Sequence, residues 1–195
     1  TSYYSERWGF CMTFNQLKSL DKKSKYRVYI DSDLNRKGKL TYGEYVIKGK
    51  SDQEILFSSY ICHPQMVNNE LSGPAILTGL ADHLSKRNNH FTYRFVLIPE
   101  TIGSIAYLSK NLSHLKSHVV GGFNLTCLGD ERSWGFIPSR YGNNISDRIA
   151  KHILNEKIGE FIEYSWLDRG SDERQYCSPG VDLPISSVTR SKYGE

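Results

Sequence analysis

The spacing of apolar residues along the chain alternates between the two-residue period of a strand and the 3.6-residue period of a helix. Early in the chain, three runs are typical of strands: residues 26–30, 38–48 and 54–61. In the second run, Leu40, Tyr42 and Val46 alternate with polar positions, which favours an antiparallel pair of strands. The third run is apolar around Leu56 and leads directly into Cys62-His63-Pro64.

Helical spacing begins after Ser72-Gly73. Three helices are predicted from apolar residues three or four positions apart: Ile76, Leu80 and Leu84; Ile105, Leu108, Leu112 and Leu115; Ile145, Ile149 and Ile153. Strand-like runs separate and follow them, at residues 93–98, 119–128, 160–166 and 183–189. This alternation predicts β-α-β crossovers, and so one α/β domain over residues 1–195 with a largely parallel sheet and antiparallel N-terminal strands.

Composition narrows the class of protein. An apolar content of 38%, with 12% aromatic residues, indicates a folded globular chain. The net charge is only +4 and the basic residues are scattered, so we expect no nucleic-acid partner. No apolar run approaches the ~20 residues that span a membrane. The four cysteines include no Cys-x-x-Cys pair, which favours reduced thiols and a cytoplasmic location.

Polar side chains gather where the predicted parallel strands end. His63 follows one strand and precedes the cluster Asn68-Asn69-Glu70, while Glu100 and Asp130 follow the next two strands. A further polar loop, residues 168–175, precedes the last strand. Each feature alone has a structural explanation, such as a turn, a helix cap or a strand end. Together at one sheet edge, where open α/β sheets bind ligands, they favour a functional site.

The residue types at this edge suit metal-assisted hydrolysis. Imidazole nitrogen and carboxylate oxygen are zinc ligands, so His63, Glu70 and Asp130 are the candidate ligands. Glu100 is the candidate general base for a water whose pKa the metal lowers. The candidate substrate-binding residues are Asn69, Arg174 and Gln175, and Arg174 is also a possible charge partner for Glu100. Cys62 adjoins His63, but neighbours on a strand point to opposite faces, which argues against a Cys–His dyad.

The order of these motifs resembles the zinc aminopeptidase and carboxypeptidase superfamily. More closely, the chain resembles bacterial aminopeptidase-like domain proteins, which are often encoded among surface-polysaccharide biosynthesis genes. The specific matches are Tyr-Tyr-x-x-x-Trp-Gly-Phe-Cys at residues 3–11, Cys-His-Pro at 62–64 and Pro-Glu-Thr-Ile-Gly-Ser-Ile at 99–105. The resemblance implies a phosphorylase/hydrolase-like three-layer fold, a zinc cofactor, and a longer protein in which a late histidine ligand follows this chain.

Only some of the superfamily's site residues have the same residue type at the matching positions of this chain. His63 matches the first metal histidine and Glu100 the general base. Gln65 stands where the superfamily has the Asp that orients this histidine, and Asn68 stands where it has the metal-bridging Asp. Two further ligand positions also hold neutral residues, namely Thr101 and Thr126. Because a neutral amide cannot bridge two zinc ions, we expect one zinc ion at most.

Two functions remain open at this point. The first is a single-zinc hydrolase that cleaves an amide bond in a small peptide or an acylated amino sugar. The second is a catalytically inactive peptidase fold that serves as a binding or scaffolding module, which the lost ligands favour. The aromatic segment at residues 3–11 is expected to pack against the sheet, and a partner surface is the alternative.

Overall fold

The computed structural model describes residue 9 and residues 11–31, 37–63 and 66–192. Contacts divide the chain into two units, Thr1–Gly38 and Lys39–Glu195. The first unit contains helix α1 (Phe14–Ser19), which Thr13 opens with a capping box. The aromatic segment at residues 3–11 lies almost wholly outside the described residues. The α/β fold is built from the second unit, and one domain over residues 1–195 stays a prediction.

The strand predicted at residues 26–30 was wrong. These residues form no regular structure, and the apolar side chains of Tyr26, Val28 and Ile30 are exposed. An alternating pattern produces a strand only when a neighbouring strand accepts its backbone hydrogen bonds. The described part of the first unit contains no strand that could pair with residues 26–30.

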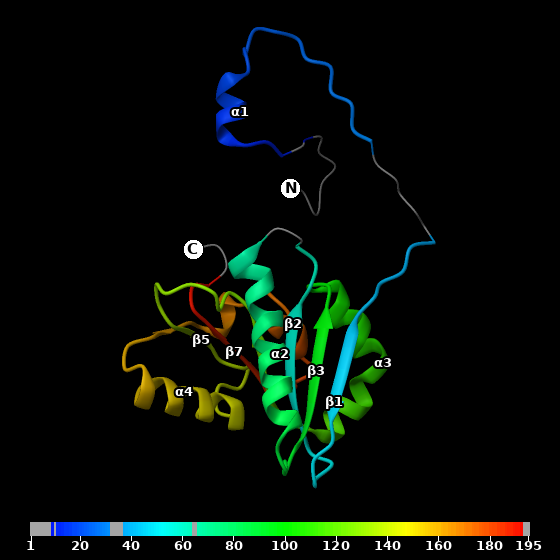
Figure 1. Cartoon of the computed structure of the whole chain (residues 1–195), viewed down its shortest axis with the longest axis vertical. Coiled ribbons are helices and arrows are strands. Elements are labelled where there is room, and N and C mark those ends of the chain that lie inside the picture. Colours follow the sequence, from blue (N-terminus) through cyan, green and yellow to red (C-terminus); the bar gives the residue numbers. More distant parts are fainter. Residues whose placement is uncertain (1–8, 10, 32–36, 64–65, 193–195) are drawn as a thin grey trace. The chain divides into compact units, whose positions relative to one another are not determined.

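The second unit is organised around a seven-stranded sheet (Figure 1). Its strands are β1 (Gly43–Ile47), β2 (Glu54–Tyr60), β3 (Thr92–Ile98), β4 (Val119–Leu125), β5 (Gly135–Ile137), β6 (Ile162–Glu163) and β7 (Ile185–Thr189). Their spatial order is β1-β3-β2-β4-β7-β5-β6. The central strands β3, β2, β4 and β7 are parallel, whereas β1 is antiparallel to β3 and β5 is antiparallel to β7. The predicted mostly parallel sheet is confirmed, whereas of the predicted antiparallel N-terminal strands only β1 is antiparallel to its neighbour, because β2 pairs in parallel on both sides.

Some strand boundaries differ from the predicted ones. The strand expected at residues 38–48 is confined to β1, and the run at residues 160–166 contributes only β6 before the short 3₁₀ helix η2 (Trp166–Asp168). Strand β5 was not predicted, because three residues are too few to show a two-residue period. It is nevertheless fully buried, and Phe136 is inaccessible to solvent.

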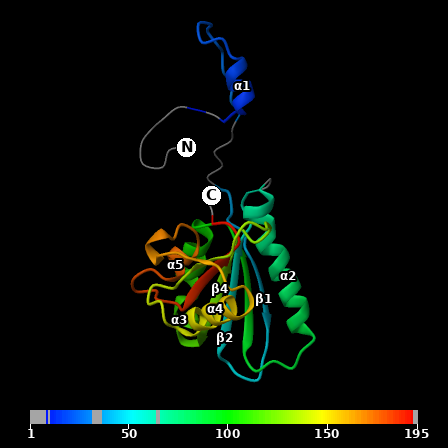
Figure 2. The ribbon, with the colours of Figure 1, turned by 90° about the vertical axis from the view of Figure 1, so that its left-hand side faces the viewer.

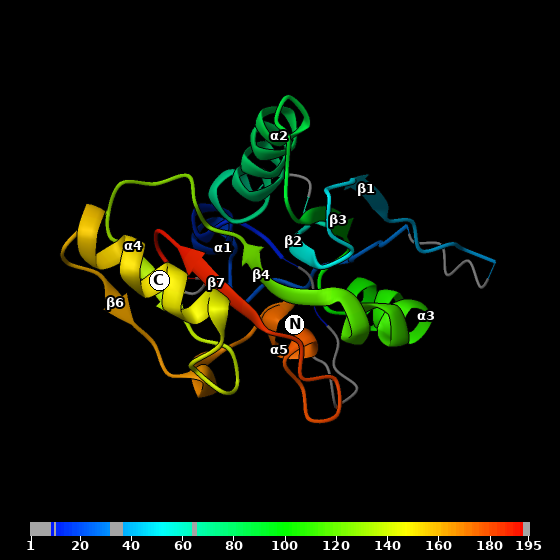
Figure 3. The same cartoon turned by 90° about the horizontal axis from the view of Figure 1, so that it is seen from below.

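Four helices cover the two faces of the sheet and produce three layers (Figures 2 and 3). They are α2 (Ser72–Ser85), α3 (Ile102–His118), α4 (Ile145–Lys157) and α5 (Glu173–Tyr176). Leu77 of α2 and Leu154 of α4 belong to clusters that share Phe123 of β4, so these helices cover one face. Tyr107 of α3 and Tyr176 of α5 pack together on the other face. Among the described helices, none is both long enough and apolar enough to span a membrane.

A glycine allows α2 to approach the strands near the site. Gly73 lies in the first turn of α2, and a Cβ atom there would collide with the Ser59 side chain of β2 and the Leu125 carbonyl of β4. No other residue type fits this close approach without displacing the helix. Gly73 therefore fixes the start of α2 against the carboxyl ends of two central strands.

Candidate metal centre

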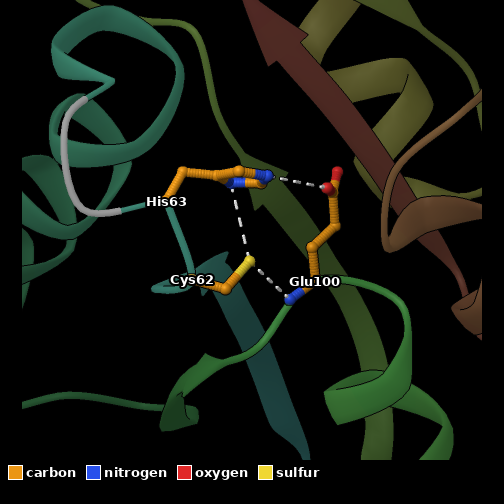
Figure 4. A group of neighbouring side chains, drawn as sticks. All are labelled: Cys62, His63 and Glu100. Atoms are coloured by element: carbon orange, nitrogen blue, oxygen red, sulfur yellow. Dashed lines mark hydrogen bonds and ion pairs between the residues drawn. The ribbon is translucent and has the colours of Figure 1, made fainter. Parts of the chain in front are cut away.

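The parallel arrangement of β2, β3 and β4 brings the segments that follow them to one edge of the sheet. Cys62 and His63 follow β2, and Glu100 follows β3. One donor atom from each of these three residues lies within 4.8 Å of the others (Figure 4). His63 Nε2 is 4.0 Å from Glu100 Oε2, and Cys62 Sγ is 3.5 Å from His63 Nδ1. The edge predicted from the sequence is therefore the place where these groups meet.

Glu70 reaches His63 from a π-helical turn, η1 (Val67–Leu71). The backbone amides of Glu70 and Leu71 both donate to the Met66 carbonyl, and this wide turn directs the Glu70 side chain inward. Glu70 Oε2 is 2.7 Å from His63 Nδ1, although the Glu70 side chain is only 4% exposed. Because a carboxylate accepts hydrogen bonds, this contact places the imidazole proton on Nδ1 and leaves the Nε2 lone pair free on the side of Glu100.

A strained turn displays Glu100. Thr101 has φ 62° and ψ −65°, and the Ile102 amide donates to the Glu100 carbonyl at 2.7 Å, which closes a γ-turn. Such a conformation is costly for a residue with a Cβ atom, so surrounding groups must hold it. Asp172 does this with one carboxylate oxygen, Oδ1, which accepts from the Thr101 amide and the Ser104 hydroxyl at 2.8 Å each. Asp172 itself is inaccessible to solvent.

The surroundings of Glu100 and Asp172 raise the pKa of both carboxyl groups. Burial raises the pKa of Glu100; the Ser171 hydroxyl and His63 oppose this rise, and the carboxylates of Glu173 and Glu70 add to it. Burial also raises the pKa of Asp172, to about 7. A carboxyl group with a raised pKa is suited to accept a proton and then donate it near neutral pH.

Cys62 is closer to His63 than the sequence indicated. Strand β2 ends at Tyr60, so the rule that neighbouring residues point to opposite faces does not apply to Cys62 and His63. Cys62 and His63 therefore do not point to opposite faces, as the strand rule predicted, and their side chains lie 3.5 Å apart. Burial raises the pKa of the Cys62 thiol, and the negative charges of Glu70 and Glu100 add to the rise. By itself the sulfur is thus a protonated thiol, which is a poor nucleophile.

The structure places Asp130 in a different hydrogen-bond network from His63. Asp130 Oδ2 accepts from Asn68 Nδ2 at 2.8 Å, and Asn68 Oδ1 accepts from the Gly129 amide at 2.6 Å. The Ser191 hydroxyl and the Arg132 backbone amide hold the pKa of Asp130 down, at about 2. Asp130 is absent from the described cluster of donor atoms around His63. Its role as a ligand stays a prediction that this geometry does not favour.

The other predicted polar residues also have structural partners or lie apart. Asn69 Oδ1 accepts from the Tyr60 hydroxyl at 3.0 Å, and its amide nitrogen lies 3.5 Å from Cys127 Sγ. Arg174 and Gln175 belong to α5, where Arg174 is exposed. Among the described contacts, no hydrogen bond or ion pair joins either of these two residues to His63 or Glu100. Gln65 lies outside the described residues.

Cys62 and Asp172 contribute to this site, although neither was predicted from the sequence as a site residue. For Asp172 a signal existed, because it lies in the polar loop at residues 168–175 that was recognised as part of the sheet edge. Its contact with the Thr101 amide depends on α5 packing beside α3, which no local pattern reveals. For Cys62 the signal was its position next to His63, and the assumed strand geometry obscured it.

The donor set fits one zinc ion. Sulfur, imidazole nitrogen and carboxylate oxygen are all zinc ligands. Glu70 Oε1 is buried without a hydrogen-bond partner among the described residues. In the same part of the chain, His63 is the only ion-pair partner of Glu70 and of Glu100, so the cluster carries excess negative charge that a cation would neutralise. A second ion has less support, because protein groups already satisfy both amide atoms of Asn68.

Comparison with known proteins agrees with this fold. A curated relative from Clostridium acetobutylicum, named "Putative polysaccharide biosynthesis protein with aminopeptidase-like domain", is 44% identical over 194 residues, which cover 100% of this chain and 44% of the relative. A crystal structure of a "putative peptidase" from the same organism is 43% identical, with a TM-score of 0.89 over 99% of this chain and 45% of that one.

Two more distant solved structures share the fold. An aminopeptidase from Aneurinibacillus sp. strain AM-1 has a TM-score of 0.66 at 16% identity, over 77% of this chain and 39% of that chain. A structure named "putative zn-dependent exopeptidase", from Bacteroides vulgatus, has a TM-score of 0.56 at 15% identity, over 77% of this chain and 63% of that chain.

The architecture and the sheet-edge site therefore define an aminopeptidase-like α/β protein. The chain belongs to the family described as "Domain of unknown function (DUF4910)", whose model matches residues 13–195. It spans about 44% of the length of the curated relative that it matches. The resemblance read from the motifs is thus confirmed.

Proposed function

We propose that this chain carries the site of a single-zinc hydrolase that cleaves an amide bond. The observation that carries the proposal is the facing pair His63 and Glu100, whose nearest nitrogen and oxygen atoms are 4.0 Å apart at the carboxyl edge of the sheet. One protein with this fold is named an aminopeptidase, and another is named a "putative zn-dependent exopeptidase".

The chain's own residues have distinct roles in this proposal. Nε2 of His63 binds the ion, and Glu70 keeps the ring oriented through Nδ1. A bound zinc ion supplies Lewis acidity, which polarises the scissile carbonyl and makes water easier to deprotonate. Glu100 accepts the proton from the attacking water and transfers it to the leaving amine, so that one water and one amide yield a carboxylic acid and an amine. Its raised pKa suits both transfers.

A hollow beside the cluster provides space for a substrate. It has a volume of about 300 Å³ and is lined by three residues with polar side chains, Cys62, His63 and Glu70, and by the apolar residues Ile61, Leu71 and Pro74. The mixed lining suits a small molecule that presents an amide beside an apolar group. A short peptide or an acylated amino sugar has these features. The polysaccharide-biosynthesis name of the curated relative supports the sugar.

The test combines metal analysis with activity in the full-length protein that contains this chain. We expect close to one zinc per chain, lost in His63→Ala, and hydrolysis of at least one compound in a panel of aminoacyl anilides and N-acyl hexosamines. Glu100→Gln should retain the metal and lose the activity. Activity that survives in Glu100→Gln would remove Glu100 from the mechanism.

A non-catalytic binding module is the second candidate function. The favouring observation is that Asn68 and Thr126, which stand at superfamily ligand positions, are engaged within the protein: Asn68 bonds Asp130 and Gly129, and Thr126 bonds Tyr60 and the Asn69 carbonyl. A module of this kind would bind no stoichiometric zinc and would be indifferent to chelators. The metal analysis therefore separates the two functions.

A further inference from the structure

We infer that the Cys62 sulfur is a second protein ligand, beside His63, of the ion that this site binds. This inference rests on the metal site proposed above and specifies its ligand set. A sulfur ligand would distinguish this chain from a site built only of histidine and carboxylates, and would favour a soft divalent metal such as zinc.

The first support is the position of the sulfur. Cys62 Sγ lies in the same cluster of donor atoms as His63 and Glu100, all within 4.8 Å of one another (Figure 4). Zinc–sulfur and zinc–nitrogen bonds are about 2.3 Å and 2.0 Å long, so a sulfur and a nitrogen that share one ion lie at most about 4.3 Å apart. Cys62 Sγ lies 3.5 Å from the His63 ring at Nδ1, and rotation of the exposed Cys62 side chain can bring the sulfur within that limit of Nε2. Cys62 is also exposed, and it lines the hollow next to the cluster, so an ion can reach it from solvent.

The second support is that both proposed ligands have the supporting hydrogen bonds expected of metal ligands. His63 has its Nδ1 contact with Glu70 at 2.7 Å. Cys62 Sγ accepts a hydrogen bond from the backbone amide of Glu100 at 3.2 Å. An N–H group directed at sulfur stabilises the negative charge that a thiolate carries, just as the carboxylate stabilises a metal-bound imidazole. The strained turn held by Asp172 fixes the position of this amide.

The third support is the balance of charge. Two carboxylates, Glu70 and Glu100, pair with His63 in this cluster, and Glu70 Oε1 is buried without a partner among the described residues. No lysine or arginine pairs with either carboxylate in the described part of the chain. A divalent cation would compensate these charges. When the sulfur–metal bond forms, the Cys62 thiol loses its proton to solvent, and no electron is transferred.

A structural role for Cys62 is the competing explanation, since the bond from the Glu100 amide alone could account for the position of the sulfur. Cobalt distinguishes the two roles, because a cobalt–thiolate bond produces a charge-transfer band in the near ultraviolet, whereas nitrogen and oxygen ligands do not. We therefore propose a Co²⁺ titration of the metal-free, reduced full-length protein, followed by competition with Zn²⁺.

The expected result is a saturable charge-transfer band in the wild type, retained in Cys11→Ser and absent in Cys62→Ser. Affinity in Cys62→Ser should fall by more than the ~10–100-fold that loss of a supporting hydrogen bond costs. In the wild type, zinc should also protect Cys62 from alkylation while exposed Cys11 stays reactive, and this measurement does not depend on the folding of a variant. Glu100→Gln should keep the band.

Two results would overturn the inference, and they are distinguishable. Cobalt binding without the band, with equal affinity in Cys62→Ser and wild type, would mean that Cys62 is not a ligand while the metal-dependent hydrolase stands. No binding of cobalt or zinc to the wild type would overturn the proposed function together with the ligand assignment.

Discussion

The Oε2 atom of Glu70 lies 2.7 Å from Nδ1 of His63. Glu70 belongs to the π-helical turn η1 and follows His63 by seven positions in the chain. This contact suits Glu70 to orient the His63 ring, whereas its residue type led to the prediction of a direct ligand role, which stays a prediction. A carboxylate bonded to Nδ1 orients the imidazole and keeps the ring proton on Nδ1, which leaves Nε2 for an ion. In the resemblance drawn from the sequence motifs, Gln65 stands where the superfamily has the Asp expected to orient this histidine.

The orienting role of Glu70 can be tested with Glu70→Gln. We expect zinc affinity to fall about 10–100-fold, because the amide retains the size of the side chain but not its charge. Competition with a chelator of known affinity measures the effect, and Asp82→Asn at an exposed site on α2 is the matched control. A loss as large as that in His63→Ala would instead support the predicted role of Glu70 as a direct ligand.

Asp172 should make the stability of the protein depend on pH. Its pKa is about 7 in the folded state, against about 3.9 in an unfolded chain. Below pH ~4 both states are protonated and the free energy of unfolding carries no penalty. As pH rises towards 7, the unfolded chain releases the proton while the folded state keeps it, so the free energy of unfolding falls. Above pH 7 the penalty is constant, on the order of 4 kcal/mol.

The variant Asp172→Asn isolates this contribution, because its oxygen can still accept from Thr101 and Ser104 while the side chain cannot ionise. We expect the free energy of unfolding of the variant, minus that of the wild type, to increase between pH 4.5 and 7.5, as measured by urea denaturation. Asp52→Asn, at an exposed carboxyl, is the control. A difference that is independent of pH would contradict the raised pKa.

Removal of Arg94 should destabilise the fold through a buried charge. Glu54 is 2% exposed, and both of its oxygens are held by Arg94, at 2.6 and 2.8 Å. The variant Arg94→Met would leave this carboxylate without its main cation, at a cost of about 3–5 kcal/mol. Urea denaturation at pH 7 measures the loss. The double variant Glu54→Gln/Arg94→Met should recover part of it, and an additive loss would show that charge is not the cause.

Gly73 offers a test of the packing between α2 and the sheet. Gly73→Ala should reduce the free energy of unfolding by about 1–3 kcal/mol, because the added methyl collides with Ser59 and Leu125. The matched control is Gly79→Ala in the same helix, where no atom lies within 4 Å of the new Cβ. That change should be neutral or stabilising by up to about 1 kcal/mol. Equal effects at both positions would contradict the close approach.

Local patterns of apolar residues were sufficient to predict most of the helices and the central strands. Apolar residues at helical spacing predicted α2, α3 and α4, and the strands between them predicted a parallel sheet with a polar carboxyl edge. The chemistry at that edge followed from residue type, because His63 and Glu100 come directly after strands β2 and β3. The predictions of helices and strands succeeded because periodicity reports which face of an element is buried, whereas the metal chemistry at the edge stays a prediction.

Which polar groups contact one another depends on the packing of distant segments. Residues 26–30 have a strand pattern without a strand, since pairing requires a partner that the pattern does not encode. Cys62 approaches His63 because β2 ends at Tyr60, and Asp172 reaches Thr101 across 71 residues of chain. Asp130 was grouped with His63 by order along the chain, but its oxygen bonds Asn68. A hydrogen bond between distant segments forms only when the donor–acceptor distance is correct to within a few tenths of an ångström. The packing of whole helices and strands sets this distance.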